Sequence, residues 1–281
     1  MFYCCLQKGL TTFTVHKDIL KRISGHLKST VHSVGLPISK QDLKLYLLKN
    51  SLRSRRAFII GNGPSLKIEY LDRLQNETSF AANMIYRSFS QTHWRPTFYV
   101  LGDVEVAKNY AHEITAAVPS TLLLSDFLAS HFLLSDRVVL FRKEHESFEN
   151  VEPLFSNNVL KIVRGGYTVT YLMLQLAWWM GVREFYVLGV DCRWNLNDYK
   201  VSGQEGQIFQ TAEIKETASS YFIKNYFRAG EKCIKPTHIH EQVLSLQAAR
   251  KFIERHGGKI YNVAKESPLD VFEHMDFDSL F

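Results

Sequence analysis

The stretch Ile59-Ile60-Gly61-Asn62-Gly63-Pro64-Ser65-Leu66 runs from an apolar strand into a glycine-flanked asparagine and then into a proline. The two glycines allow positive φ angles and a close approach of the backbone to a ligand. Because proline lacks an N–H, it suits the first turn of a helix, so a helix is predicted from Pro64. The positive end of that helix, near Ser65, favours an anion. The stretch therefore predicts a βα turn that binds a nucleotide.

This turn differs from the two commonest nucleotide-binding motifs. Leu66 stands where a dinucleotide fingerprint has its third glycine, and no Gly-Lys-Ser or Gly-Lys-Thr follows. Neither an NAD-type site nor a P-loop is predicted. Taken alone, a Gly-x-Gly turn is equally consistent with a purely structural βα turn.

Short apolar or β-branched runs alternate with helical stretches after residue 56, a pattern typical of a mainly parallel α/β sheet. Helices are predicted over 168–180 and 241–256, and the polar segment 195–210 is predicted to be a mobile lid. The fold class is therefore α/β and Rossmann-like over 57–281, with a C-terminal helical and lid region. The predicted strands span residues 57–60, 79–82, 98–101, 121–124, 138–141, 160–163, 185–188 and 259–263.

The basic charge of the chain is concentrated in its first 56 residues. They hold eleven Lys and Arg against two Asp, whereas the whole chain carries a formal charge of +6. Two amphipathic helices are predicted between Asp18 and Leu52, separated by a turn over 33–39, so 1–56 forms a helical appendage. Its cations suit an anionic membrane surface, at about 1 kcal/mol per well-placed charge. A solvated helical face is the alternative, and nucleic acid is not predicted because no aromatic-basic interleaving accompanies the charge.

Composition also predicts where the protein works. The longest apolar run, 172–182, is interrupted by Gln175 and is shorter than the about 20 residues that span a bilayer. The N-terminus lacks the apolar core of a secretory signal. Four cysteines match neither a zinc spacing nor a disulfide framework. We therefore expect a cytoplasmic protein, with peripheral contact at the inner membrane if the basic helices bind lipid.

Polar residues follow four of the predicted strands. They are Asn62, Asn83, Asp103 and Asp191. Each alone is a common turn former or helix cap. Because ligands bind beyond the carboxyl ends of strands in a doubly wound sheet, four such residues on one edge predict a shared ligand site.

Several blocks of sequence carry a resemblance to a known superfamily. They are the quoted turn, Asn83, Gly165-Gly166-Tyr167-Thr168-Val169-Thr170, Gly181, Glu184-Phe185-Tyr186-Val187-Leu188-Gly189-Val190-Asp191, and the ending from Ile260 to Phe281. The chain from residue 56 onward resembles the superfamily that joins the bacterial sialyltransferases of glycosyltransferase family 42 to the MptE-like proteins. The latter include pterin pyrophosphokinases and Maf-type flagellin glycosyltransferases. The ending is more similar to the MptE-like branch, and the resemblance implies a GT-A-like variant of the Rossmann-like fold.

The resemblance implies a set of nucleotide contacts. In the sialyltransferases the donor is a CMP-linked nonulosonic acid, held by the Gly-Asn-Gly turn and by the position of Asn83. A third family asparagine falls near Asp103, where a carboxylate suits a ribose hydroxyl or a metal instead. A family serine has no clean counterpart, and the nearest hydroxyls are those of Thr168 and Thr170. The implied nucleotide-binding residues are Gly61, Asn62, Gly63, Ser65, Asn83, Asp103, Thr168, Thr170 and Asp191.

The resemblance also implies three catalytic residues. Two family tyrosines that hold the leaving phosphate fall on Arg193 and Tyr199, and arginine suits phosphate because its fixed donors pair with two oxygens. The family's general base falls on His240, with His238 as the alternative if the register shifts. Histidine titrates near neutral pH and can take the proton of an attacking hydroxyl. No metal or other cofactor is required for this chemistry.

Three hypotheses for function follow. The first is a bacterial sialyltransferase-like enzyme of lipopolysaccharide or capsule synthesis, transferring a sugar from a CMP-linked donor to a glycan or lipid-linked acceptor. The second is an MptE-like pyrophosphokinase that uses ATP, with Mg²⁺ held by Asp103 and Asp191. The third is a nucleotide-binding protein without catalysis. The donor sugar, the acceptor and the oligomeric state stay open.

Overall fold

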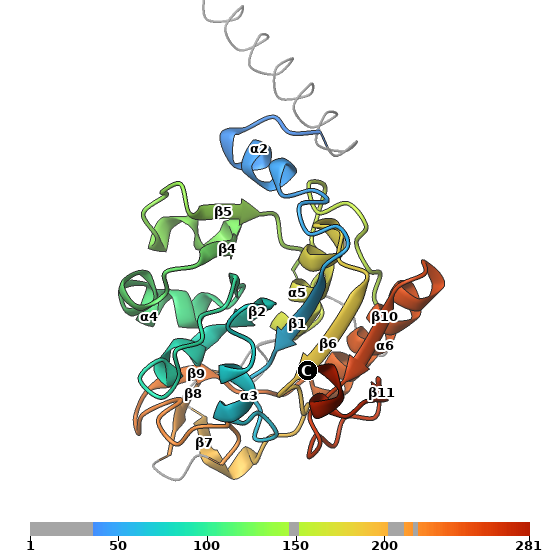
Figure 1. Cartoon of the computed structure of the whole chain (residues 1–281). Helices are drawn as coiled ribbons and strands as arrows, with labels where there is room; N and C mark the ends of the chain where they lie inside the picture. Colours follow the sequence, from blue (N-terminus) through green and yellow to red (C-terminus); the bar gives the residue numbers. More distant parts are fainter. Residues whose placement is uncertain (1–35, 146–151, 202–210, 216–218) are drawn as a thin grey trace, which may run out of the picture.

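The computed structural model describes residues 36–145, 152–201, 211–215 and 219–281. Its main sheet is built from β1 (Arg56–Ile60), β2 (Thr78–Ala82), β3 (Phe98–Leu101), β4 (Thr121–Ser125), β5 (Val138–Phe141), β6 (Glu184–Leu188), β10 (Lys259–Asn262) and β11 (Glu273–His274). The order is β11-β10-β6-β1-β2-β3-β4-β5, and every pair is parallel. The predicted Rossmann-like α/β fold is confirmed (Figure 1).

Helices cover both faces of this sheet. They are α2 (Lys40–Leu47), α3 (Ile68–Asp72), α4 (Val104–Ala117), α5 (Val169–Trp179) and α6 (Ile239–Arg255), with the 3₁₀ turns η1 (Asn83–Ser88), η2 (Asp126–His131), η3 (Leu196–Asp198) and η4 (Phe277–Leu280). Alternate residues of each strand point to opposite faces, so Ile59 packs on the α5 side and Phe58 on the α4 side. The buried apolar side chains therefore form two clusters, one on each side of the sheet.

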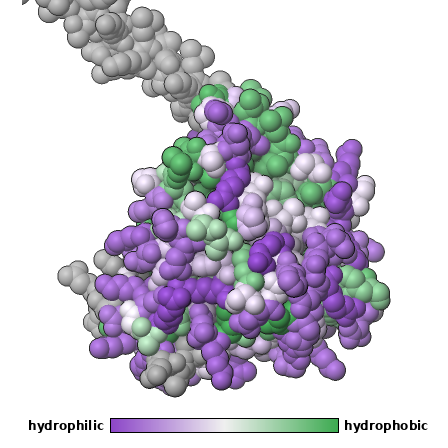
Figure 2. All heavy atoms as spheres, turned by 60° about the vertical axis from the view of Figure 1, so that its left-hand side comes forward, coloured by the Kyte–Doolittle hydropathy of each residue, from purple (hydrophilic) through white to green (hydrophobic). Residues whose placement is uncertain are grey.

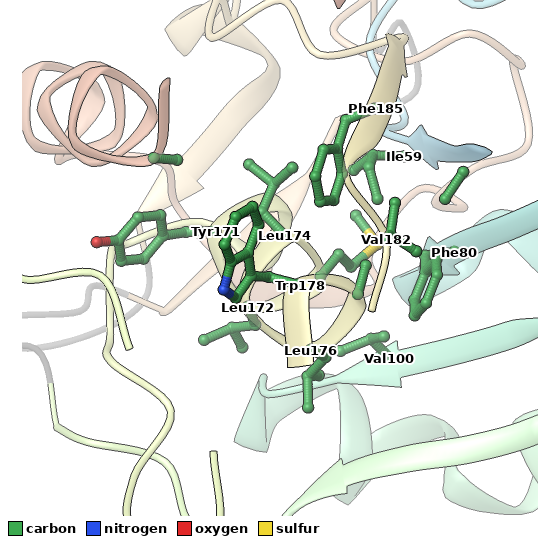
Figure 3. Close-up of a cluster of buried hydrophobic side chains, with 14 of the residues drawn as sticks. Ile59, Phe80, Val100, Tyr171, Leu172, Leu174, Leu176, Trp178, Val182 and Phe185 are labelled. Atoms are coloured by element: carbon green, nitrogen blue, oxygen red, sulfur yellow. The ribbon is translucent and has the colours of Figure 1, made fainter. Parts of the chain in front are cut away.

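Helix α5 is the centre of one of these cores. Every residue from Thr170 to Trp179 is buried, which explains why the sequence there is apolar all round. Figure 3 shows Leu172, Leu174 and Leu176 of this helix beside side chains from neighbouring strands. The start of α5 is thereby held against the carboxyl edge of the sheet.

The strand order reverses between β1 and β6. Strands β2 to β5 follow on one side of β1, whereas β6, β10 and β11 lie on the other. Such a switch point leaves a crevice at the carboxyl ends of the two central strands. The turn after β1 and the segment after β6 therefore face each other.

The segment expected to be a lid contributes in part to a second sheet. Its strands are β7 (Tyr199–Val201), β8 (Thr211–Ile214) and β9 (Lys232–Ile234), antiparallel in the order β7-β8-β9. This sheet lies toward the carboxyl ends of the main strands, with β9 beside α4 (Figure 1). Residues 202–210, the rest of the predicted lid, lie outside the described residues.

Buried Arg87 fastens this second layer to the main sheet. Its guanidinium donates two hydrogen bonds to Glu231, at 2.6 and 2.9 Å, one to Glu113 at 3.2 Å and one to the carbonyl of Tyr226 at 3.1 Å. Paired carboxylates compensate the burial of the cation. The ion pairs join η1, α4 and the segment before β9.

Two predictions of local structure are wrong. Residues 160–163 form a turn rather than a strand, because Asn158 accepts backbone donors from Leu160 and Lys161, and only a bridge from Val163 to Lys143 remains. No helix begins at Pro64 either, since the chain turns back at Leu66 and α3 starts at Ile68.

The described part of the N-terminal segment packs on the sheet. Ser39 begins α2 with a capping box, as the predicted new start at that turn requires. The helix covers the free edge of β5, where Gln41 accepts a hydrogen bond from Leu140 N–H, and the Trp179 indole donates to the carbonyl of Leu45. The first predicted helix, after Asp18, lies outside the described residues.

On the face that Figure 2 shows, most side chains are hydrophilic, and apolar side chains gather toward the end of the molecule that carries α2. Exposed residues there include Leu36, Leu43 and Leu47. Among the residues described, none of the helices combines the length and the apolar content needed to cross a bilayer.

Gln175 gives a test of the α5 core. Its amide accepts from the N–H groups of Ser156 and Arg164 at 3.0 and 2.9 Å, and donates to the carbonyls of Arg164 and Tyr171. For Gln175→Leu we expect the free energy of unfolding to fall by about 2–5 kcal/mol, because each buried group left unpaired costs about 1–3 kcal/mol. Urea denaturation followed by circular dichroism measures it.

The exposed Gln75 provides the matched control, and Gln75→Leu is expected to change stability by less than about 0.5 kcal/mol. If Gln175→Leu lowered the free energy of unfolding no more than Gln75→Leu does, the hydrogen bonds of the Gln175 amide would not stabilise the core.

Candidate nucleotide-binding site

A cavity of about 650 Å³ runs along the carboxyl edge of the main sheet, at the switch point and beyond it. This volume lies within the range of small-molecule sites. Among the predicted site residues it brings together Gly61, Asn62, Gly63, Asn83, Asp103, Thr168, Thr170, Asp191 and Arg193. Ser65, Tyr199 and His240 are not among the described residues that line it.

The turn after β1 is pressed against the end of β6. Gly61 N–H donates to the carbonyl of Leu188 at 2.7 Å, and Gly63 N–H to that of Gly189 at 2.8 Å. A Cβ at Gly61 would overlap the Gly189 carbonyl, and one at Gly63 would overlap the carboxylate of Asp191. Neither Gly61 nor Gly63 uses the positive φ that glycine allows, whereas Gly189 has a φ of +66°. Glycine is needed in this turn for close approach.

Asp191 closes the same turn from the β6 side. Its carboxylate accepts a hydrogen bond from Ser65 N–H at 2.9 Å and a short one from the Ser65 hydroxyl. The donors of Ser65 are therefore used inside the protein, and the side chain is buried. The prediction of an anion site at Ser65 is corrected on this ground, because the negative charge there belongs to Asp191.

Asn62 and Asn83 present two unpaired acceptors. The Asn62 amide donates to the carbonyl of Ala82 at 3.3 Å, but its Oδ1 and the Oδ1 of Asn83 are buried and have no hydrogen-bond partner within the described part of the chain. A buried polar group left unpaired costs about 1–3 kcal/mol. A ligand with N–H or O–H donors would satisfy both oxygens.

The backbone of Asn83 is held in an uncommon conformation. Its φ is +56°, its carbonyl accepts from the Tyr99 hydroxyl at 2.6 Å, and the next N–H, that of Met84, donates to the Tyr226 hydroxyl at 3.2 Å. Tyr167 and Cys192 also have positive φ and also line the cavity. Left-handed conformations of residues other than glycine gather at functional sites, because surrounding contacts must hold them.

The amino end of α5 forms one wall of the cavity. Thr168 is its N-cap and accepts a hydrogen bond from Thr170 N–H at 3.3 Å. The first N–H groups of this eleven-residue helix lie at the positive end of its dipole, which favours an anionic ligand group.

The two candidate histidines differ in position. His238 stacks on Tyr167, which lines the cavity, with ring centroids 4.3 Å apart, and its Nδ1 lies 2.9 Å from the Thr237 hydroxyl. His240 is exposed in the first turn of α6. Neither histidine is among the described residues that line the cavity, and of the two only His238 is seen to contact a residue that does.

Arg193 and Tyr199 are also separated. Arg193 is exposed and lines the cavity, whereas Tyr199 is buried behind Tyr221, with the two hydroxyls 3.0 Å apart. Burial raises the pKa of the Tyr199 hydroxyl. The tyrosine that faces the cavity is Tyr221, which follows Tyr199 by 22 residues.

Asp103 both caps a helix and lines the cavity. Its carboxylate caps α4 by accepting from Val106 N–H at 3.0 Å. Burial raises the pKa of this carboxyl above its ordinary value, while the Val106 hydrogen bond and the charge of Lys143 act in the opposite direction. In the described residues, His, Cys, Asp and Glu side chains form no group of three or more that would hold a metal ion.

Sequence reasoning missed several cavity residues, notably Lys143, Tyr221, Tyr226 and Gln242. Lys143 comes two positions after β5, so the rule that found Asp103 at a strand end would have found it too. The two tyrosines come from a segment with no recognisable motif. Tyr226 is held by a residue distant in sequence, because its carbonyl accepts a hydrogen bond from Arg87.

The fold and this cavity define a Rossmann-like α/β protein with a ligand site at its switch point. The family model described as 6-hydroxymethylpterin diphosphokinase MptE-like matches residues 37–197, more than half of the chain. The protein therefore belongs to the MptE-like family, which confirms that part of the expected resemblance. No curated protein sequence matches the chain significantly.

Solved structures similar to the chain have low sequence identity. The Maf glycosyltransferase from Magnetospirillum magneticum AMB-1 is 17% identical over 88% of this chain, with a TM-score of 0.49, and the chain spans 40% of its length. The sialyltransferase CstII from Campylobacter jejuni, in complex with cytidine-5'-monophosphate, is 15% identical over 79% of this chain and 85% of its own, with a TM-score of 0.41. The monofunctional α-2,3-sialyltransferase Cst-I from Campylobacter jejuni is 14% identical over 79% of this chain and 81% of its own, with a TM-score of 0.42.

The hydrogen bonds from Ser65 to the carboxylate of Asp191 predict that this carboxylate stabilises the fold. For Asp191→Asn and for Ser65→Ala, measured in EDTA, we expect the free energy of unfolding to fall by about 1–3 kcal/mol, because a hydrogen-bonded charge is lost or left unpaired. The double variant should lose less than the sum of the two, since the residues share one interaction.

Asp136, whose side chain is exposed, supplies the control, and Asp136→Asn should leave stability unchanged within about 0.5 kcal/mol. Unchanged stability of Asp191→Asn in EDTA, combined with loss of stabilisation by Mg²⁺, would instead identify Asp191 as a metal ligand.

Proposed function

We propose that the protein is a glycosyltransferase that moves a nonulosonic-acid-type sugar from a CMP-linked donor to a surface-glycan acceptor, with inversion. The observation that carries this proposal is the pair of buried, unpaired amide oxygens of Asn62 and Asn83 in the cavity wall. Both belong to the sequence blocks in which the chain resembles the sialyltransferases. A nucleoside offers the ribose hydroxyls and base N–H groups that would pair with these oxygens.

The phosphate of the donor would lie near the start of α5. The helix dipole and the guanidinium of Arg193 both favour negative charge there, and Thr168 and Tyr221 add hydroxyl groups to the same cavity. This charge grows as CMP leaves with the electron pair of the glycosidic bond, so these groups would stabilise the transition state more than the bound donor. The step needs no metal.

A general base completes the mechanism. It takes the proton of the acceptor hydroxyl while the oxygen attacks the anomeric carbon. Of the two histidines, His238 is better supported, because its ring packs on a cavity residue. His240 is exposed and does not line the cavity, so it would serve only if the first turn of α6 moved toward the cavity.

The family name favours a second function. A pyrophosphokinase would bind MgATP and transfer its diphosphate to a hydroxymethylpterin, with Asp103 and Asp191 as metal ligands. Two hydrogen bonds argue against this function, because the carboxylate of Asp191 already accepts from Ser65 and that of Asp103 already caps α4. Nucleotide and metal selectivity separates the two functions.

We also propose that the surface of the protein around α2 contacts an anionic membrane. Helix α2 exposes Leu43 and Leu47 beside Lys40, a combination that suits the boundary between headgroups and acyl chains. Such contact would bring the enzyme to lipid-linked acceptors at the inner face of the membrane.

Nucleotide selectivity is the direct test of the proposed donor. We expect CMP to raise the Tm more than CDP, UDP, GDP or ATP do, with no requirement for Mg²⁺. Asn62→Ala should weaken CMP binding about tenfold, since losing one hydrogen bond of about 1.4 kcal/mol has this effect. Asn157→Ala, at an exposed position, is the control. Stabilisation only by ATP with Mg²⁺ would favour the pyrophosphokinase, and UDP or GDP selectivity would exclude a CMP-linked donor.

The histidines provide a matched pair for the catalytic step. We expect His238→Ala to lower kcat for sugar transfer by about 10²–10⁴-fold, the typical contribution of a general base. His240→Ala should retain most of the activity, and both variants should bind CMP like the parent protein. Loss of transfer in His240→Ala alone would reassign the base to His240.

A further inference from the structure

The far end of the cavity, toward β5, has its own chemistry. It is lined by Phe127 of η2 and by Lys143 and His145, which follow β5. None of these residues takes part in the nucleotide contacts proposed above. They follow β4 and β5, whereas the turn after β1 and Asn83 lie on the other side of β3.

Two rings form a platform at this end. Phe127 and His145 stack with centroids 4.3 Å apart and an angle of 22° between their planes. Phe127 is 37% exposed and lines the cavity, so part of its ring surface is open to a ligand. The carboxylate of Asp126 accepts a hydrogen bond from Lys143 N–H at 3.2 Å, so η2 is tied to the segment after β5.

The side chain of Lys143 lies across Gly102. Its Cδ and Cε are 3.5 and 3.6 Å from the position that a Cβ at Gly102 would occupy. Asp103 is the next residue, and the positive charge of Lys143 lowers the pKa of its carboxyl, in opposition to burial. A cation, a carboxylate and an aromatic platform therefore meet at one end of one cavity.

We infer that Phe127, Lys143 and His145 form a subsite for a sugar ring that carries an anionic group. The ammonium of Lys143 would pair with a carboxylate or a phosphate. The platform would pack against the apolar face of the pyranose, and Asp103 would accept hydrogen bonds from its hydroxyls. This subsite deepens the proposed glycosyltransferase function and rests on it.

Two sources supply such a ring. One is the sugar of the donor, since nonulosonic acids carry a carboxylate, and the other is an acidic residue of the acceptor glycan. The chemistry recognised at Lys143 is the same in both. The experiment therefore has one arm for each source.

The acceptor arm compares methyl β-glucuronide, methyl β-glucoside and methyl β-glucoside 6-phosphate, titrated by NMR with and without CMP. The donor arm compares CMP-3FNeuAc with CMP by calorimetry. Each arm uses Lys143→Gln and Phe127→Ala, with Lys161→Gln and Leu133→Ala as exposed matched controls. CMP affinity and Tm, expected to equal those of the parent protein, show that each variant is folded.

We expect the anionic rings to bind at least tenfold more tightly than the glucoside, or CMP-3FNeuAc to bind at least tenfold more tightly than CMP. In either case Lys143→Gln should abolish the difference, Phe127→Ala should weaken binding, and the controls should change nothing. The arm that responds identifies the source of the ring.

The subsite is overturned if charged and neutral rings bind alike, if no ring binds in either arm, or if binding is insensitive to Lys143→Gln. Preference for 6-hydroxymethylpterin over all sugars would also overturn it. Absence of CMP binding would overturn the proposed function. The subsite is tested separately, because the sugars of the acceptor arm are also titrated without nucleotide.

Discussion

The close approach of the β1 turn to the end of β6 is the contact on which the site depends. Backbone hydrogen bonds from Gly61 and Gly63 extend the pairing of the two strands past their ends, and any side chain at either glycine would push the segments apart. Asp191 then ties Ser65 to the same point. With the turn fixed from both sides, the Asn62 amide is held under the carbonyl of Ala82 at the end of β2. The switch point of the sheet thus becomes a preorganised wall rather than a mobile loop.

A second constraint acts through helix burial. Because α5 is apolar on every side, it is enclosed on all sides and its axial position is fixed by packing. Gln175 is the exception in this run, and three of its four hydrogen bonds hold the irregular segment 156–164 against the helix. Fixing the helix body also fixes its first turn. The dipole end at Thr168 therefore faces the cavity without contributing any side-chain charge of its own.

Sequence patterns predicted the parts of the fold that follow from local rules. Alternating apolar runs located β1 to β6 and β10 within one or two residues, and the strand-end rule placed Asn62, Asn83, Asp103 and Asp191 around one cavity. Predictions from local sequence failed where contacts between residues distant in sequence decide the structure. Pro64 suits a helix start, but the carboxylate of Asp191, more than a hundred residues away, takes the donor of Ser65 and keeps the chain in a turn. Similarly, Tyr199 and Tyr221 cannot be told apart in sequence, because the second sheet decides which of them faces the cavity.

The second sheet also supports the part of the cavity between the proposed nucleotide site and the proposed sugar subsite. Tyr226 accepts the Met84 N–H beside Asn83, and the Arg87 ion pairs with Glu231 hold the segment that carries it. Main sheet and second sheet thus share the residues around Asn83, in the middle of the cavity edge. On one side of that point lie backbone-fixed amides and a helix dipole, which suit a nucleotide. On the other side lie a lysine and aromatic rings, which suit a sugar that is charged. A bond between two such groups would lie near Asn83, whose carbonyl and following N–H are held by the hydroxyls of Tyr99 and Tyr226.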